Sequence, residues 1–193
     1  MRGGYNHLSI LITRQKKREE LGIPLDARWL LNVGELIPRK NQETIIRAVA
    51  QIEGIYLTIA GKGVLFDELS SLIVELRVND RVKLLGYRSD ISELCKSCDI
   101  FAFPSFHEGL PVSVMEAMAS GLPIACSNIR GNTDLVDENG GALFAPSNLN
   151  SCKVAIDKIL STDLRQMGHY NLKKVNTFSQ KRVNEQMSDI IKR

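Results

Sequence analysis

The chain has 193 residues, of which 44% are hydrophobic and 24% are charged. These values are ordinary for a globular protein with one sizeable core. The net charge of +3 suits an anionic small ligand or an anionic membrane surface, and it is too small to argue for nucleic acid. No apolar run approaches the ~20 residues of a membrane span, and the first residues lack the apolar core of a signal peptide. We therefore expect a cytoplasmic location.

The first segment with a clear pattern is charged. It runs from Arg14 to Leu21, and it is followed by Gly22 and Pro24, which are residues that end helices. We interpret this segment as a helix, and its basic run as a solvated face rather than a surface that binds a partner.

From residue 28 onward, short apolar runs bounded by turn residues alternate with stretches of helical periodicity. The apolar runs predict strands at residues 29–33, 55–60, 81–86, 99–103, 123–126 and 140–144. The helical stretches cover residues 42–52, 65–76, 91–96, 110–119, 149–160, 162–176 and 180–191. This alternation predicts an α/β fold, a Rossmann-like parallel sheet of about six strands with helices on both faces. The pattern indicates no internal repeat and no clear second domain.

The most informative stretch runs from residue 99 to residue 121. Its loop carries Glu108 and leads into a helix that contains Glu116. Ligands of parallel sheets bind at the carboxyl ends of the strands, and a helix N-terminus there can hold a phosphate. Two ionised carboxylates beside a phosphate suit a vicinal diol, because they accept the hydrogen bonds that a diol donates. Spacing alone leaves open a plain surface loop with two solvated glutamates.

The loop after the first strand also carries residues that suit an anionic ligand. Gly34 allows the backbone to approach a ligand, and Lys40 lies near the start of the next helix, where a cation opposes the helix dipole. An anionic ligand would explain Lys40, although this feature alone favours a plain surface lysine. The later Gly61-Lys62-Gly63 turn lacks the third glycine of the dinucleotide fingerprint, since Phe66 occupies that position.

Four cysteines are present, and two of them form the run Cys95-Lys96-Ser97-Cys98. This spacing occurs in metal and redox sites, but no second Cys/His pair lies nearby in the sequence. We interpret these cysteines as small buried hydrophobic residues.

The ordered set of motifs resembles one family. It closely resembles the C-terminal, nucleotide-sugar-binding domain of the group 1 (family 4) glycosyltransferases, which have the two-domain GT-B fold. The resemblance covers residue 27 to the C-terminus. By this resemblance, residues 28–193 form a donor-binding domain with C-terminal helices, and residues 1–27 are the remnant of a helical linker. The motifs that carry it are Val33-Gly34-Glu35, Arg39-Lys40, Ala60-Gly61-Lys62-Gly63, Leu85-Gly86-Tyr87, Pro104-Ser105, Glu108-Gly109, the run from Glu116 to Pro123, Gly131-Asn132, Asp134 and Gly141.

The resemblance implies a retaining transferase that moves a hexosyl group from a nucleotide-diphosphate sugar, most commonly a UDP-sugar, to a saccharide or lipid-linked acceptor. It implies that Glu108 and Lys40 are catalytic, with Lys40 on the donor diphosphate and Glu108 facing the sugar hydroxyls. Glu116 would hold the ribose hydroxyls, and Arg88 would lie near the base. The other implied substrate-binding residues are Gly34, Arg39, Ser105, Gly109 and Leu110.

No cofactor or metal is expected. Metal-dependent transferases typically use an Asp-x-Asp clamp, which this sequence lacks. A cation such as Lys40 and a helix N-terminus can stabilise the charge on a diphosphate leaving group instead.

Some features depart from the family. Glu35 stands where the family often has Arg, and Asp134 stands where Glu is commoner. The N-terminal acceptor domain is missing from these residues, so we expect it elsewhere in the same protein or on a separate partner chain, with the helix at 180–191 crossing back onto it. The alternatives are a sugar-nucleotide 2-epimerase-like domain and a non-catalytic donor-binding subunit of a split enzyme. A peripheral contact with the inner face of the membrane is also compatible with the charge.

Overall fold

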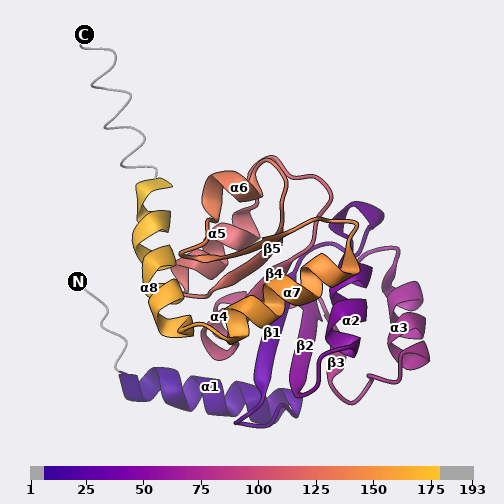
Figure 1. The fold of residues 1–193 in the computed structure, drawn as a ribbon. Coiled ribbons are helices and arrows are strands. Elements are labelled where there is room, and N and C mark those ends of the chain that lie inside the picture. The colour runs from indigo at the N-terminus through magenta and orange to yellow at the C-terminus, as the bar shows by residue number, and fades with distance from the viewer. Residues whose placement is uncertain (1–6, 179–193) are drawn as a thin grey trace.

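The computed structural model describes residues 7–178 (Figure 1). Six parallel strands form one sheet in the order β3-β2-β1-β4-β5-β6. The prediction of a six-stranded parallel sheet is therefore confirmed. The strands are β1 (Arg28–Val33), β2 (Ile55–Ala60), β3 (Val82–Gly86), β4 (Ile100–Phe103), β5 (Ile124–Ser127) and β6 (Gly141–Phe144).

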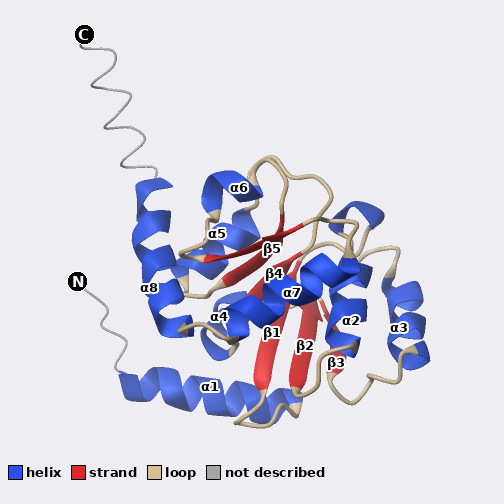
Figure 2. Cartoon of the chain, in the orientation of Figure 1, coloured by secondary structure: helices blue, strands red, loops and turns tan. Residues whose placement is uncertain are grey.

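Helices cover both faces of the sheet, as predicted (Figure 2). Buried side chains of α2, α3 and α7 pack with one face, and those of α1, α4, α5 and α6 pack with the other. The helices are α1 (His7–Leu21), α2 (Gln42–Ala50), α3 (Phe66–Glu75), α4 (Ile91–Ser97), α5 (Val112–Ala119), α6 (Asn132–Leu135), α7 (Leu149–Leu160) and α8 (Leu164–Val175). Two short 3-10 turns complete the set, η1 (Pro38–Lys40) and η2 (Asn176–Phe178).

Strand β1 shows why these residues form a central strand. Leu30 packs into one core, whereas Trp29 and Leu31 pack into the other. Because successive side chains of a strand point to opposite faces, a strand with helices on both sides needs an almost continuous apolar run. The run that begins at Trp29 meets this requirement.

A few local predictions differ from the structure. Helix α5 begins at Val112 instead of residue 110, because Pro111 lies at the N-cap position with a non-helical backbone. The four-residue helix α6 was not predicted, since it is shorter than the periodicity that sequence analysis detects. The helix predicted at residues 180–191 lies outside the described residues.

The basic run of α1 is not a solvated face, so this part of the sequence interpretation is wrong. Lys17 and Arg18 are buried, and the Arg18 side chain has no exposed surface. Its guanidinium forms an ion pair with Asp99 at 2.8 Å and donates to the carbonyl oxygens of Pro24 (2.7 Å) and Ala27 (2.9 Å). Another residue of the run, Lys16, is exposed, so the run is solvated only in part. Helix α1 is therefore held to the sheet through its basic side chains.

All four cysteines are buried and free, which confirms their interpretation as small hydrophobic residues. Burial raises the pKa of Cys95 to about 11 and that of Cys152 to about 12. The thiols therefore stay protonated at neutral pH, which disfavours metal binding and redox exchange. Within the described part of the chain, no helix combines the length and apolar character needed to cross a membrane.

Acid should weaken the contact between α8 and the turn before β6. Burial raises the pKa of Asp137, but hydrogen bonds from Lys174 and Tyr170 outweigh it and lower the pKa to about 2. The folded-state pKa is depressed, so this contact stabilises the fold above about pH 4 and is lost as the pH falls toward 2. Because Asp137 is 36% exposed, solvent screens the pair, and we expect a loss of about 1 kcal/mol or less.

Urea unfolding at about pH 5 and about pH 2.5 measures this loss. We expect Asp137→Asn to lose less stability than the wild type over this interval. Asp157→Asn is the matched control, because Asp157 is exposed and makes no side-chain hydrogen bond or ion pair among the described residues. An identical pH dependence in all three proteins would contradict the expectation.

Candidate functional site

The strand order determines where a ligand can bind. The chain passes from β1 toward β2 on one side and from β4 toward β5 on the other, so the order reverses between β1 and β4. Loops that leave neighbouring strands in opposite directions open a crevice at the carboxyl ends of those strands. The loops there are residues 34–41, after β1, and residues 104–111, after β4.

The loop after β1 is tightly held. The amide of Gly34 donates to the carbonyl of Ala60 at 3.0 Å, at the ends of β1 and β2. The loop then forms η1 and ends at Asn41, whose backbone is left-handed with φ of 53°. The Asn41 side-chain amide donates to the carbonyl oxygens of Pro104 and Pro146, both at 3.0 Å. Asn41 thereby joins the loop after β1 to the loop after β4.

The two loops also meet through charged side chains. Lys40 Nζ lies 2.7 Å from Glu108 Oε1, and Arg39 lies 3.3 Å from the same oxygen. Arg39 also donates to the carbonyl of His107 at 3.0 Å. The Lys40 ammonium lies 5.1 Å from the centre of the Phe103 ring, within reach of a cation–π contact.

The exposure of these side chains differs. Glu108 is 8% exposed and Lys40 15%, whereas Arg39 is 45% exposed. A carboxylate with so little access to water is held by its cationic neighbours. The site can therefore offer an exposed guanidinium, an ammonium and an acceptor carboxylate to one ligand.

A close backbone approach supports the Glu108 loop. Gly131 has φ of +91°, and a Cβ added there would lie 2.6 Å from the carbonyl oxygen of Gly109 and 2.9 Å from that of Glu108. Only glycine fits this conformation and this approach. The segment that joins β5 to α6 therefore lies directly against the loop, with Gly109 and Leu110 exposed beside it.

Ser105 lies below the surface of this loop. It is fully buried, and its hydroxyl has no hydrogen-bond partner among the described residues. Its carbonyl accepts a hydrogen bond from Ser127, and Asn132 donates to Ser127 in turn. Ser105 therefore anchors the loop through its backbone, and any direct contact of its hydroxyl with a ligand remains a prediction.

Two more buried polar residues border the crevice, and sequence analysis missed both. Asn32 donates from β1 to the carbonyl of Ala102 on β4, and Gln42 donates to the carbonyl of Glu35. The side-chain oxygens of Asn32 and Gln42 are buried without partners within residues 7–178. The one available signal was a polar residue, Asn32, inside an otherwise apolar strand.

Glu116 and Arg88 lie outside this group of contacts. Glu116 is exposed on α5 and forms no ion pair with the described residues. Arg88 pairs with Asp90 and Glu20, both at 2.6 Å, and the hydrogen bonds that its guanidinium donates to these carboxylates raise its pKa. Contacts of Glu116 with a ribose and of Arg88 with a base therefore remain predictions. The structure brings together Gly34, Arg39, Lys40 and Glu108: a Cβ added at Gly34 would contact the Lys40 side chain at 3.7 Å.

The family described as "Glycosyl transferases group 1" matches residues 13–175, which is most of the chain. The chain belongs to the group 1 glycosyltransferases. Its sheet and helices match the C-terminal half of GT-B enzymes, as the sequence resemblance implied. No group of three or more His, Cys, Asp or Glu side chains able to hold a metal ion occurs among the residues that the structure describes.

Proteins similar to this chain include two named glycosyltransferases. The chain is 30% identical over 174 residues to the lipopolysaccharide core biosynthesis glycosyltransferase LpsE of Rhizobium meliloti, covering 87% of this chain and 51% of LpsE. It is 32% identical over 159 residues to the UDP-Gal:alpha-D-GlcNAc-diphosphoundecaprenol alpha-1,3-galactosyltransferase of Escherichia coli, covering 75% of this chain and 41% of that enzyme.

A solved structure of a similar protein contains a nucleotide sugar. Anabaena Alr3699/HepE in complex with UDP-glucose aligns with a TM-score of 0.78 and 26% identity, over 92% of this chain and 53% of that one. This chain thus spans about half the length, or less, of the relatives that it matches.

Proposed function

We propose that this chain is the donor-binding domain of a retaining glycosyltransferase. The donor is a nucleotide-diphosphate sugar, with a UDP-sugar favoured, and the acceptor is a saccharide or a lipid-linked sugar. The observation that carries the proposal is the Lys40–Glu108 pair at 2.7 Å, located at the carboxyl ends of β1 and β4 in a chain of the group 1 family. Two of the relatives, a UDP-galactose enzyme and a protein solved in complex with UDP-glucose, support the choice of UDP.

The charges in the crevice suit the chemistry of such a donor. Transfer breaks the bond between the sugar and the diphosphate, and the diphosphate leaves with the bonding electrons. In the proposed mechanism, Lys40 and the exposed Arg39 stabilise the charge that develops on the leaving diphosphate. The Glu108 carboxylate accepts hydrogen bonds from the sugar hydroxyls. Because Lys40 already holds Glu108, both groups are oriented before the donor binds.

The remaining substrate-binding roles follow the family resemblance. Gly34 leaves room for the donor beside Lys40, since its Cβ position would meet only side-chain atoms at 3.7 Å or more. Gly109 and Leu110 offer backbone amides at the exposed end of the loop, and Glu116 binds the ribose hydroxyls. Glu35 is exposed on the same loop as Lys40, where the family often has Arg, so Arg39 is the second cation available to the diphosphate.

The acceptor binds to an additional domain, which belongs to the rest of the same protein or to a partner chain. We expect the isolated chain to bind its donor and to transfer sugar poorly, because acceptor binding and cleft closure require that second domain. Efficient turnover by the purified chain without a partner would contradict this part of the proposal. The proposed location is the cytoplasm, in peripheral contact with the inner face of the membrane.

A thermal-shift panel of UDP, GDP, ADP and their sugars tests donor binding. A nucleotide that binds only the folded state raises the unfolding midpoint by mass action, so we expect a rise with UDP and UDP-sugars. No shift with any of these compounds up to millimolar concentrations would overturn the proposed function.

Two variants separate the roles of the glutamates. We expect Glu116→Ala to weaken UDP binding by about tenfold, because ribose hydrogen bonds to a charged group are lost. Glu108→Ala should leave UDP affinity nearly unchanged and remove the additional affinity that the sugar gives. Titration calorimetry with UDP and with the UDP-sugar measures both quantities, and Glu53→Ala is the matched exposed control. Equal loss of UDP affinity in the two variants would contradict the division of roles.

A further inference from the structure

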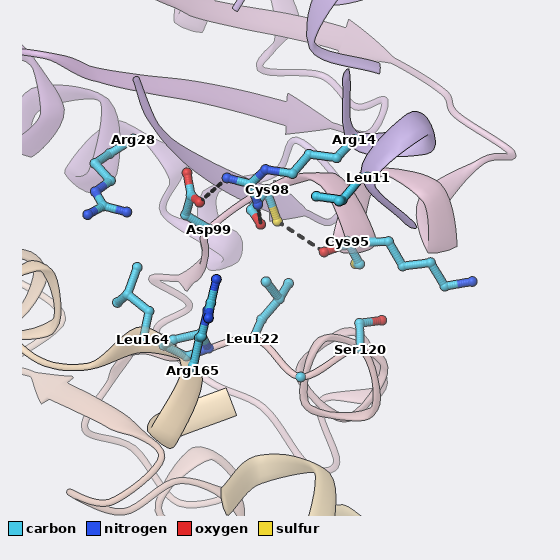
Figure 3. Close-up of a pocket in the computed structure, with 13 residues that line it drawn as sticks. Leu11, Arg14, Arg28, Cys95, Cys98, Asp99, Ser120, Leu122, Leu164 and Arg165 are labelled. Carbon is cyan, nitrogen blue, oxygen red and sulfur yellow. Dashed lines mark hydrogen bonds and ion pairs between the residues drawn. The ribbon is translucent and has the colours of Figure 1, made fainter. Parts of the chain in front are cut away.

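A cavity lies at the amino ends of the strands, opposite the carboxyl ends that carry Lys40 and Glu108, and Figure 3 shows the residues that line it. It has a volume of about 460 Å³ and lies at the amino ends of β1, β4 and β5, where Arg28, Asp99 and Pro123 line it. Helix α1 contributes Arg14, and the first turn of α8 contributes Arg165. We refer to it below as the amino-edge cavity.

Basic side chains outnumber acidic ones in the lining of this cavity. Four cationic residues, Arg14, Arg28, Lys96 and Arg165, line it together with one carboxylate, Asp99. That carboxylate is already engaged, because it pairs with Arg14 at 2.5 Å and with Arg18 at 2.8 Å, and accepts from the Trp29 amide at 2.8 Å. Asp99 therefore pairs with Arg14 and Arg18, and it forms no ion pair with Arg28 or Arg165.

Two of the cations are available for a ligand. Arg28 and Arg165 are exposed, and their guanidinium groups make no hydrogen bond or ion pair with the residues that the structure describes. In Figure 3 the Arg165 side chain extends toward Asp99, and Arg28 and Arg14 lie on either side of that carboxylate. Converging cations repel one another unless an anion is bound between them.

We propose that the amino-edge cavity binds a phosphate group. Guanidinium groups form bidentate hydrogen bonds with phosphate oxygens, and Arg28 and Arg165 both line this cavity. The cavity is larger than a phosphate, and Leu122, Leu164 and the half-exposed Leu11 also line it. These apolar residues suit the hydrocarbon part of a phosphate ester. The ester is either an anionic lipid headgroup or a soluble phosphate ester.

Titration calorimetry with inorganic phosphate tests the site directly. We expect saturable binding by the wild type and at least about a tenfold loss of affinity in the Arg28→Ala/Arg165→Ala double variant, since charge-assisted hydrogen bonds are removed. Both side chains are exposed, so the double variant should keep the unfolding midpoint of the wild type. The single variants Arg28→Ala and Arg165→Ala provide a second test, because each should lose less phosphate affinity than the double variant.

Two controls identify where the phosphate binds. Lys16→Ala/Lys173→Ala removes the same charge from exposed positions outside the cavity and should leave phosphate affinity unchanged. Lys40→Ala removes a cation of the candidate donor site, so saturable phosphate binding that persists in this variant is assigned to the amino-edge cavity. Three outcomes would overturn the proposal. They are a loss of phosphate binding only in Lys40→Ala, an equal loss in Lys16→Ala/Lys173→Ala, and no saturable binding by the wild type. Donor binding is measured separately with UDP, so the two sites succeed or fail independently.

Vesicle sedimentation distinguishes the two sources of phosphate. Binding of the wild type, but not of Arg28→Ala/Arg165→Ala, to phosphatidylglycerol vesicles would identify a lipid headgroup as the ligand. Saturable phosphate binding without sedimentation would identify a soluble phosphate ester. Phosphatidylcholine vesicles are the neutral control, because they should bind neither protein.

Discussion

Replacement of Asp99 by alanine is expected to lower the free energy of unfolding by about 3–5 kcal/mol. Asp99 is buried and forms ion pairs with Arg18 at 2.8 Å and Arg14 at 2.5 Å. Burial lowers the pKa of Arg18 and the Asp99 charge opposes this effect, so the buried guanidinium depends on its partner carboxylate. Without Asp99, a fully buried charge would keep as partners, among the described residues, only backbone carbonyls and the Trp29 ring.

Urea unfolding at neutral pH measures this loss. Asp157→Ala is the matched control, because Asp157 is exposed on α7, and it should change stability by less than about 0.5 kcal/mol. Asp99→Asn keeps the shape of the side chain and removes its charge, so it isolates the electrostatic part of the effect. A loss below about 1 kcal/mol in Asp99→Ala would show that α1 is not held to the sheet through this ion pair.

Gly61→Ala is expected to damage both stability and donor binding. A Cβ added at Gly61 would lie 1.8 Å from the carbonyl oxygen of Gly34, so the backbone at the end of β1 must move. Such overpacking costs about 1–3 kcal/mol or more. Gly34 begins the loop that carries Arg39 and Lys40, so the displacement would also shift the two cations proposed to bind the diphosphate.

Urea unfolding and UDP titration of the same Gly61→Ala preparation measure the two effects. Gly54→Ala is the control, because Gly54 has a positive φ of +70° but nothing within 4 Å of its Cβ position. It should cost about 1–2 kcal/mol of backbone strain and leave UDP affinity unchanged. A stable Gly61→Ala protein with unchanged UDP affinity would contradict the proposed coupling between the end of β2 and the donor site.

The Lys40–Glu108 pair has a consequence for donor binding. The ammonium that is proposed to bind the diphosphate is already in contact with Glu108, which is 8% exposed. A diphosphate must therefore share Lys40 with Glu108 or displace it. Arg39 is 45% exposed and contacts His107 and Glu108 through one terminal nitrogen, so its other nitrogens can donate to the anion. Arg39 is thus expected to make the first contact, and Lys40 the contact that also orients Glu108.

Local pattern was sufficient to predict the strands, most of the helices and the loops of the candidate site. Apolar runs such as residues 29–33 predict buried strands because a strand packed on both faces needs apolar side chains in succession. The same local evidence placed Lys40 and Glu108 in loops between a strand and a helix. It favoured a plain surface lysine for Lys40 and left a solvated loop open for Glu108, and the family resemblance gave both residues a role. Local pattern did not predict α6, which is only four residues long, and it did not predict that α5 begins at Val112.

The sequence by itself determined an α/β chain, the family to which it belongs and the two loops that carry the charged residues. Only the tertiary structure placed β1 beside β4, which brings Lys40 and Glu108 to 2.7 Å although they are 68 residues apart. It alone showed that Arg18 is buried against Asp99 and that Arg28 and Arg165 line one cavity. The physical reason is that periodicity records which face of an element is apolar, whereas strand order and charge pairing depend on contacts between distant segments.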